Sequence, residues 1–161
     1  MNNLNIRKVE NFDLEILSEI YKNTYDVFDV GERWTKESAL ELLKYWLKRQ
    51  PDLAFLAETD NKIVGAFFAA VKPWWDGVHL VDGELFVDPD NQKQKVGTLL
   101  SKHMFEQAIK KYDAKVWDTY TFKNSEHPLS WYKKQGFDEN KDWVMISGDL
   151  KEAIRRLENN S

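Results

Sequence analysis

A short loop between two apolar segments is the first stretch of the sequence whose residues could do chemistry. In VDPDNQKQKVGTLL, from Val87 to Leu100, a strand-like run ends at a proline, a polar loop follows, and a helical pattern begins near Gly97. The first N–H groups of a helix lack intrahelical partners and the helix dipole is positive there, so a diphosphate can bind at such a point. An ordinary strand-to-helix connection with a solvated basic turn is the alternative.

Two carboxylates precede this loop, in an expected strand over residues 79–88. Strict alternation along that strand places Asp82, Glu84 and Phe86 on one face. A carboxylate there can take a proton from an ammonium group, directly or through a water, or it can simply hold a cation. We expect Glu84 to be the general base, with Asp82 as the second choice.

The composition excludes several other kinds of chemistry. The 161 residues include no Cys, which excludes disulfides, thiolate nucleophiles and Cys-ligated zinc, and the 3 His residues show no metal-ligand spacing. The net charge of −4 argues against a nucleic-acid partner. No apolar run is long enough for a membrane span and no signal peptide is recognisable, so we expect a cytoplasmic protein with no membrane partner. The length predicts one domain over residues 1–161.

The elements that position these residues follow from hydrophobic periodicity. Strands are expected at 4–9, 53–58, 62–71, 79–88, 114–122 and 143–150. Helices are expected at 13–28, between an N-cap at Thr35 and a stop at Pro51, at 95–112 and at 128–135. Residues 151–160 are expected to form a surface helix or a frayed end. The order β-α-α-β-β-β-α-β-α-β predicts an α/β (α+β) protein, a mixed sheet with helices on its faces.

This order and two motifs resemble the GNAT superfamily of acyl-CoA-dependent N-acetyltransferases. LFVDPDNQKQKVGTLL is similar to the family's pyrophosphate-binding segment, in which V-x-P is followed by Q/R-x-x-G-x-G/A, and here Lys95 replaces the first glycine. SWYKKQGF is similar to the family's fYxkxGF helix and turn. The resemblance covers residues 6–150 and implies the three-layer GNAT fold with acetyl-CoA as cofactor.

The resemblance also implies roles for single residues. The cofactor-binding residues would be Phe86, Val87, Gln92, Lys93, Gln94, Lys95, Val96, Gly97, Thr98 and Ser125. Lys95 is acceptable there if its backbone is already helical and its side chain points outward. Tyr132 matches the family tyrosine that lies near the thiol sulfur and protonates it, although an aromatic side chain packing on the sheet is the alternative. With no Cys for an acyl-enzyme, direct attack by a primary amine is the simpler route.

A finer similarity concerns the acceptor. NSEHPLSWYKKQGF is similar to the EHPxxFYxKxGY segment of aminoglycoside 6'-N-acetyltransferases, which implies an amino sugar or another small polyamine. Trp74 and Trp75, together with Glu84, would then line a pocket for a polycation, or the two Trp residues form a hairpin tip that packs on a neighbour. A non-catalytic acyl-CoA-binding or regulatory module and a protein N-terminal or lysine acetyltransferase are the other functions left open. The oligomeric state is also open, with a homodimer as one alternative.

Overall fold

The computed structural model describes residues 4–28, 30–123 and 126–159. They divide into two compact units, Met1–Phe122 and Lys123–Ser161, and each unit is described by itself. The prediction of one domain over residues 1–161 therefore stays a prediction. Within the described ranges, no helix has the length and apolar character needed to cross a membrane.

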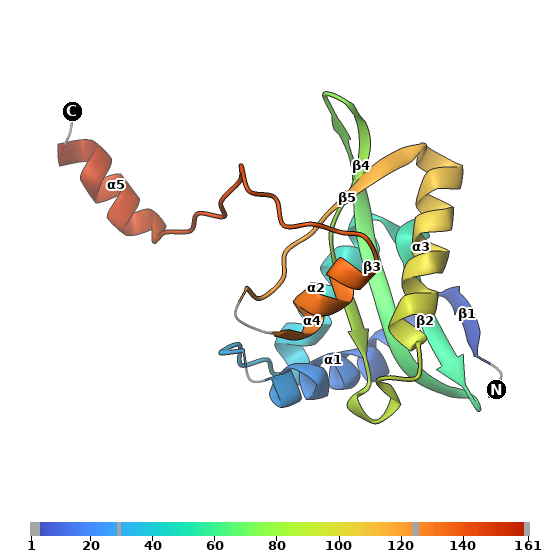
Figure 1. Cartoon of the computed structure of the whole chain (residues 1–161). Coiled ribbons are helices and arrows are strands. Elements are labelled where there is room, and N and C mark those ends of the chain that lie inside the picture. The colour runs from blue at the N-terminus through green and yellow to red at the C-terminus, as the bar shows by residue number, and fades with distance from the viewer. Residues whose placement is uncertain (1–3, 29, 124–125, 160–161) are drawn as a thin grey trace. The chain divides into compact units, whose positions relative to one another are not determined.

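A five-stranded mixed sheet forms the centre of the first unit (Figure 1). Its strands are β1 (Asn5–Lys8), β2 (Ala54–Thr59), β3 (Lys62–Trp74), β4 (Gly77–Val87) and β5 (Ala114–Asp118). They lie in the order β1-β2-β3-β4-β5, antiparallel throughout except that β4 and β5 run parallel. The predicted mixed sheet is confirmed, although β5 is shorter than the predicted strand 114–122.

Helices cover both faces of this sheet, as the predicted three-layer arrangement requires. Helices α1 (Leu14–Phe28) and α2 (Lys36–Arg49) pack on each other and on one face, and α3 (Val96–Tyr112) packs on the other. Consecutive side chains of β3 face the two helix layers alternately. Phe68 belongs to the core under α1 and α2, whereas the ring of Phe67 contacts Phe105 of α3 at 6.3 Å between centroids. Alternation along a strand therefore gives one sheet two apolar faces.

Local signals set the ends of the helices that carry the site. The Thr35 side chain accepts a hydrogen bond from the Ser38 N–H, and Ser38 in turn accepts one from the Thr35 N–H, so the predicted N-cap of α2 is a reciprocal capping box. Before α1, the carboxylate of Asp13 accepts two hydrogen bonds from Arg7, each of 2.8 Å. This buried pair fixes the start of α1 against β1, and so sets the position of the helix over the sheet.

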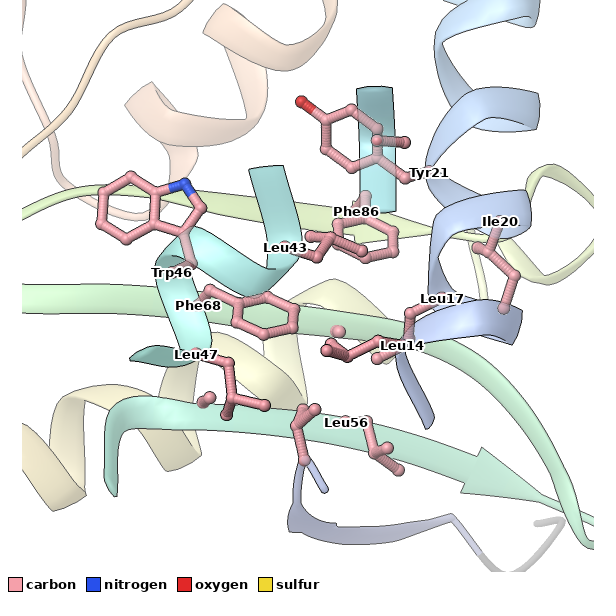
Figure 2. Packing of buried hydrophobic residues seen from close by; sticks show 14 of the residues in the cluster. Leu14, Leu17, Ile20, Tyr21, Leu43, Trp46, Leu47, Leu56, Phe68 and Phe86 are labelled. Carbon is pink, nitrogen blue, oxygen red and sulfur yellow. The ribbon is translucent and has the colours of Figure 1, made fainter. Parts of the chain in front are cut away.

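The core between the sheet and the first two helices is rich in aromatic rings (Figure 2). The ring of Tyr21 meets Phe86 of β4 edge-on, with centroids 5.1 Å apart, and Phe68 stacks against Phe86 at 6.4 Å. Figure 2 also shows the hydroxyl of Tyr21 and the indole nitrogen of Trp46 on the same side of this apolar cluster. Two polar tips therefore border the core where α1 and α2 cover β4.

The second unit contains two helices, α4 (Glu126–Lys134) and α5 (Leu150–Asn159), which confirm the helices predicted near residues 128–135 and 151–160. The predicted strand 143–150 is wrong, because residues 143–149 form no regular element. An apolar run becomes a strand only when a neighbouring strand supplies hydrogen-bond partners. Among the described residues no strand pairs with this segment, and Val144, Met145 and Ile146 remain exposed.

Candidate active site

The loop after β4 leads to an open helix N-terminus. From Val87 the chain makes a short 3-10 turn, Pro89–Asn91, and enters α3 at Val96. No side chain caps this helix start in the described ranges, and the first turn contains no acidic residue. Since the N–H groups of a first turn have no intrahelical partner, those at the start of α3 can donate to the oxygens of a diphosphate.

Gly97 keeps space open above these N–H groups. A Cβ added at Gly97 would meet only the Cγ2 atom of Val87, at 3.7 Å, which is an ordinary van der Waals distance. The backbone of Gly97 is also not left-handed. The packing of the protein therefore does not require a glycine here, whereas a ligand approaching the helix start does benefit from the missing side chain.

Lys95 stands in a conformation that the sequence interpretation did not foresee. Its backbone is left-handed, with φ 66° and ψ 9°, so the condition that it be helical already is not met. Its side chain is exposed, as expected. A non-glycine residue in this region costs roughly 1–2 kcal/mol. A glycine would adopt this conformation without strain, whereas Lys95 adopts it at some cost.

The remaining predicted loop residues have mixed roles. The side chain of Gln92 donates to the Val87 carbonyl at 3.1 Å, and the Thr24 hydroxyl of α1 donates to the same oxygen at 3.2 Å. These bonds tie the loop to the end of β4. Lys93 is exposed and has a left-handed backbone, with φ 63°, and the Gln94 side chain bonds to a carbonyl within the loop.

Of the other predicted cofactor residues, two are buried, one is half-buried and one lies outside the described ranges. The side chains of Phe86 and Val96 are buried in the protein core and are therefore not available to a ligand. Thr98 is half-buried in the first turn of α3. Ser125 lies outside the described residues.

A bulge divides β4 into two halves. Phe68 pairs with Glu84 and Ala70 with Val81, so two residues of β4, Asp82 and Gly83, oppose a single residue of β3. Both bulge residues have positive φ, 50° and 105°. β5 pairs with β4 only as far as Val81, so within the described ranges the β4 edge beyond the bulge has no neighbouring strand.

The bulge interrupts the alternation from which the face of Asp82 was predicted. Because Phe68 and Ala70 are two residues apart on β3, their partners Glu84 and Val81 share the face that α1 and α2 cover. Strict alternation therefore does not hold between Val81 and Glu84. The carboxylate of Asp82 nevertheless lies on the side of α2, with its Oδ2 atom 3.9 Å from Nη1 of Arg49.

Glu84 is the half-buried carboxylate of this face. Burial is the main cause that raises its pKa to about 7, from an ordinary value of 4.5, and the negative charges of Glu32 and Asp82 raise it further. The Tyr21 hydroxyl and the Trp46 indole N–H, two donors beside the carboxylate, oppose this rise in pKa. The Tyr21 hydroxyl donates to the Oε2 atom at 2.9 Å. A carboxyl group with a pKa near neutrality is suited to accept and release protons under physiological conditions.

Trp74 and Trp75 lie at the other end of β4, in the tip of the β3–β4 hairpin. Trp75 is 87% exposed, and the ammonium group of Lys72 lies 4.0 Å from the ring centroid of Trp74. Trp74 pairs with Gly77, which is seven residues from Glu84 along the strand, or roughly 23 Å. The structure therefore does not bring the two Trp residues together with Glu84, and their role in substrate binding stays a prediction.

His79, near this tip, is engaged by carboxylates. Its Nδ1 atom lies 2.6 Å from Asp118 of β5 and its Nε2 atom 2.8 Å from Asp76. The hydrogen bonds that the imidazole makes to the two carboxylates, the one to Asp118 above all, raise the pKa of His79. Among the described residues, no three acidic or His side chains gather in a way that could hold a metal ion.

Tyr21 and Trp46 are the residues that sequence reasoning missed. Tyr21 occupies one of the apolar positions of the helical pattern that predicts α1, and this pattern alone assigns its hydroxyl no role. A buried Tyr or Trp needs a partner for its polar tip. A Tyr or Trp on the apolar face of a predicted helix is therefore the sequence signal that points to both residues.

In the second unit, Tyr132 lies on α4 and contacts two aromatic rings. Its ring centroid is 5.1 Å from Trp131 and 6.3 Å from Phe137, edge-on in both cases. Gly136 has φ 88°, and the Phe137 N–H donates to the Tyr132 carbonyl at 3.2 Å. The Y-x-K-x-G-F motif is therefore partly a helix C-terminal cap, with its usual hydrophobic contact. The catalytic role of Tyr132 stays a prediction.

Comparison with known proteins identifies this arrangement. The sequence profile of the acetyltransferase (GNAT) domain matches residues 50–139, more than half of the chain. The chain belongs to the GNAT acetyltransferase family. It is also 30% identical over 148 residues to an uncharacterized N-acetyltransferase of Methanocaldococcus jannaschii. That match includes 88% of this chain and 65% of the relative, so the chain spans slightly less than two thirds of the relative's length.

Solved structures have the same GNAT fold. A possible acetyltransferase from Clostridium difficile 630 aligns with a TM-score of 0.75 at 14% identity, over 91% of this chain and 97% of that one. The aminoglycoside N-acetyltransferase AAC(6')-Iy in complex with CoA aligns with a TM-score of 0.70 at 18% identity, over 93% of this chain and 97% of that one. At these identities the similarity shows the fold, and the predicted GNAT-like α/β fold is confirmed.

Proposed function

We propose that this GNAT chain transfers an acetyl group from acetyl-CoA directly to a primary amine. The observation that carries the proposal is Glu84, a half-buried carboxylate whose pKa of about 7 suits a general base. It lies on β4 of the GNAT fold, and the loop that follows this strand leads to the uncapped start of α3.

The residues of the chain fit acetyl-CoA, which supplies the acetyl group as a thioester. The N–H groups at the start of α3 would hold its diphosphate, with Gly97 leaving the room and Lys93 and Lys95 adding positive charge nearby. Among the described residues no strand pairs with the β4 edge beyond the bulge, so the Val87 N–H would be available to the rest of the cofactor, whereas the Val87 carbonyl already accepts from Gln92 and Thr24. No acidic residue stands in the first turn to repel it.

Glu84 would take one proton from the acceptor's ammonium group and so produce the neutral amine that attacks the thioester. The negative charges of Glu32 and Asp82, which raise the pKa of Glu84, also favour a cation at this position. Tyr132 is the proposed acid, whose phenolic proton would pass to the departing sulfur.

A small acceptor with several amines, such as an amino sugar of the aminoglycoside type or a polyamine, is the substrate class that we favour. The acidic and aromatic surroundings of Glu84 support it, as does the E-H-P sequence at the start of α4. The name of the aminoglycoside N-acetyltransferase with the same fold is a further, weaker support. A protein N-terminal or lysine acetyltransferase is the second candidate, and a non-catalytic acyl-CoA-binding module is the third.

Release of free CoA tests the function. Acetyl-CoA is incubated with kanamycin-type sugars, polyamines, a lysine peptide and a peptide with a free N-terminus, and the new thiol is titrated. We expect release with the small amines and little with the peptides. Release with the peptides alone would favour the second candidate, and binding of acetyl-CoA without release by any amine would favour the third.

The pH dependence of Glu84→Gln separates a base from an anchor. If Glu84 is the base, the variant loses most activity near neutrality and recovers partly at high pH, where solvent supplies neutral amine. If it only holds the cation, KM rises and kcat is spared. Asp82→Asn is the parallel variant on the same strand.

Gly97→Asp tests the phosphate site, since a carboxylate there repels the diphosphate and fills its space. Acetyl-CoA should raise the Tm of the native chain by mass action but leave that of the variant unchanged. Gly148→Asp is the matched control, because a Cβ at Gly148 meets nothing within 4 Å and one at Gly97 meets only Val87 Cγ2 at 3.7 Å. An equal rise in Tm for the chain and both variants would remove the loop from the site.

Tyr132→Phe tests the acid, because it deletes the phenolic proton and keeps the ring against Trp131 and Phe137. We expect kcat to fall on the order of ten- to a thousand-fold, with stability and acetyl-CoA affinity nearly unchanged. Full activity would mean that water protonates the sulfur.

A further inference from the structure

Two aromatic side chains with polar tips meet Glu84 from different helices. Tyr21 of α1 is 1% exposed and donates its hydroxyl proton to Glu84 Oε2 at 2.9 Å. Trp46 of α2 is 5% exposed, and its indole N–H lies close enough to Glu84 to hold the carboxyl pKa down. Figure 2 shows the polar atoms of Tyr21 and Trp46 on the same side of the apolar cluster.

The indole N–H of Trp46 is nevertheless incompletely satisfied. It is buried, and no acceptor in the described ranges meets hydrogen-bond geometry with it. A buried donor without an acceptor is costly and uncommon in proteins. Because Tyr21 already bonds one oxygen of Glu84, the ionised carboxylate has a second oxygen to offer to the indole.

We propose that Tyr21 and Trp46 are positioning residues that hold the ionised Glu84 carboxylate between two donors, with the indole N–H closing its hydrogen bond only onto the charged form. The proposal rests on the proposed function for its catalytic meaning. In the proton transfer, an N–H bond of the ammonium breaks as an O–H bond forms on Glu84, and Glu84 later releases this proton to water. Donors bind a charged acceptor more strongly than a neutral one, so both side chains favour the return of Glu84 to its charged form.

The other charges that face Glu84 act in opposite directions. Glu32, held by the indole N–H of Trp34 at 2.7 Å, and Asp82 disfavour a charged Glu84. Arg49 of α2 lies 3.9 Å from Asp82 and offsets part of its charge. The two uncharged donors are therefore the groups on α1 and α2 that favour ionisation of Glu84 by direct contact.

A titration of the unmodified protein tests this inference without any enzyme assay. The indole N–H signal of Trp46 is followed by ¹⁵N NMR and the Glu84 carboxyl by ¹³C NMR between pH 5 and 9. We expect both signals to move with one midpoint, because the indole bond forms as the carboxylate forms. The indole of Trp117 on β5 serves as a control, because it donates at 3.0 Å to a main-chain carbonyl, that of Asp82, which does not titrate. A Trp46 signal that stays constant while Glu84 titrates would overturn the proposal.

Two variants measure the effect of each donor. Trp46→Phe and Tyr21→Phe keep an aromatic ring and delete the donor, so each should raise the Glu84 midpoint by about one pH unit. Tyr45→Phe is the control, since that hydroxyl accepts a bond from Arg49 and has no contact with Glu84 among the described residues. An unchanged midpoint in both folded variants refutes the positioning role, and if a variant does not fold, the titration of the unmodified protein still decides.

An activity measurement separates this inference from the proposed function. If the chain acetylates amines, the acid limb of the profile of kcat/KM against pH should shift to higher pH in Trp46→Phe and Tyr21→Phe, by as much as the Glu84 midpoint does. If no amine is acetylated, the proposed function fails while the NMR titration still tests the contact. Active variants with an unshifted acid limb would contradict the positioning role alone.

Discussion

Replacing Glu84 by Gln should stabilise the fold above neutral pH, although it removes the proposed base. The folded-state pKa of Glu84 is about 7, against an ordinary value of 4.5, chiefly because burial disfavours its charge. The folded chain therefore binds this proton more tightly than the unfolded chain does. The resulting contribution to stability is complete below pH 4.5 and is lost as the pH rises through 7.

The size of the effect follows from these two values. Their difference is about 2.5 (7 − 4.5), and each step of one in pKa is worth about 1.4 kcal/mol. Integrated between pH 5 and pH 8, the native chain should lose roughly 2–2.5 kcal/mol of unfolding free energy through Glu84 alone. Gln does not ionise, and its amide oxygen can still accept the Tyr21 hydroxyl, so the variant should escape most of this loss.

Urea unfolding at pH 5, 6.5 and 8 measures the difference. The unfolding free energy of Glu84→Gln, relative to that of the native chain, should increase as the pH rises. In a thermal melt at pH 8 this increase corresponds to a Tm roughly 4–10 °C higher. Glu41→Gln makes the same chemical change on the exposed surface of α2 and should leave the pH dependence unaltered. Parallel pH curves for Glu84→Gln and the native chain would refute the burial of this carboxylate.

Three further predictions concern the backbone and the hairpin tip. Lys95→Gly should raise the unfolding free energy by roughly 0.5–1 kcal/mol in urea, because glycine relieves the left-handed strain, and a loss would contradict the observed φ of 66°. Gly83→Ala should destabilise the chain by roughly 2–4 kcal/mol, because its Cβ would lie 2.3 Å from the Phe68 carbonyl oxygen; a neutral effect would argue against the bulge. His79→Gln should destabilise the chain most below pH 6.5, where the native imidazolium binds Asp118. The difference in Tm between the variant and the native chain should decrease as the pH rises through the raised pKa of His79, and a constant difference would contradict the ion pair.

Much of the fold could be predicted from sequence because its signals are local. The Thr35 cap, the helical spacing in 13–28 and the apolar run of 62–71 each depend on residues within a few positions of one another. The strand 143–150 failed for the opposite reason. Its apolar residues have strand propensity, but pairing depends on a neighbouring strand, which the sequence of this segment does not specify.

The candidate site could be predicted only in part for a similar reason. Residue type and position in the strand were enough to select Glu84. Its partners Tyr21 and Trp46 lie 63 and 38 residues earlier in the chain (84 − 21 and 84 − 46), and only the packing of α1 and α2 on β4 brings them to the carboxylate. No local spacing connects residues that far apart.

The bulge at Asp82 and Gly83 connects the two halves of the site. Because two β4 residues oppose one residue of β3, Glu84 stays on the face of α1 and α2, whereas strict alternation from Val81 would turn it to the face of α3. The pairing with β5 ends at the same point, and among the described residues no strand pairs with the edge of β4 that follows, where we propose that acetyl-CoA binds. The carbonyl of Asp82 is held by the Trp117 indole, and Gly83 leaves no room for a side chain. One local distortion therefore places the proposed base and ends the pairing with β5, so, if the proposed function is right, a change that removes the bulge should impair proton transfer and acetyl-CoA binding in the same variant.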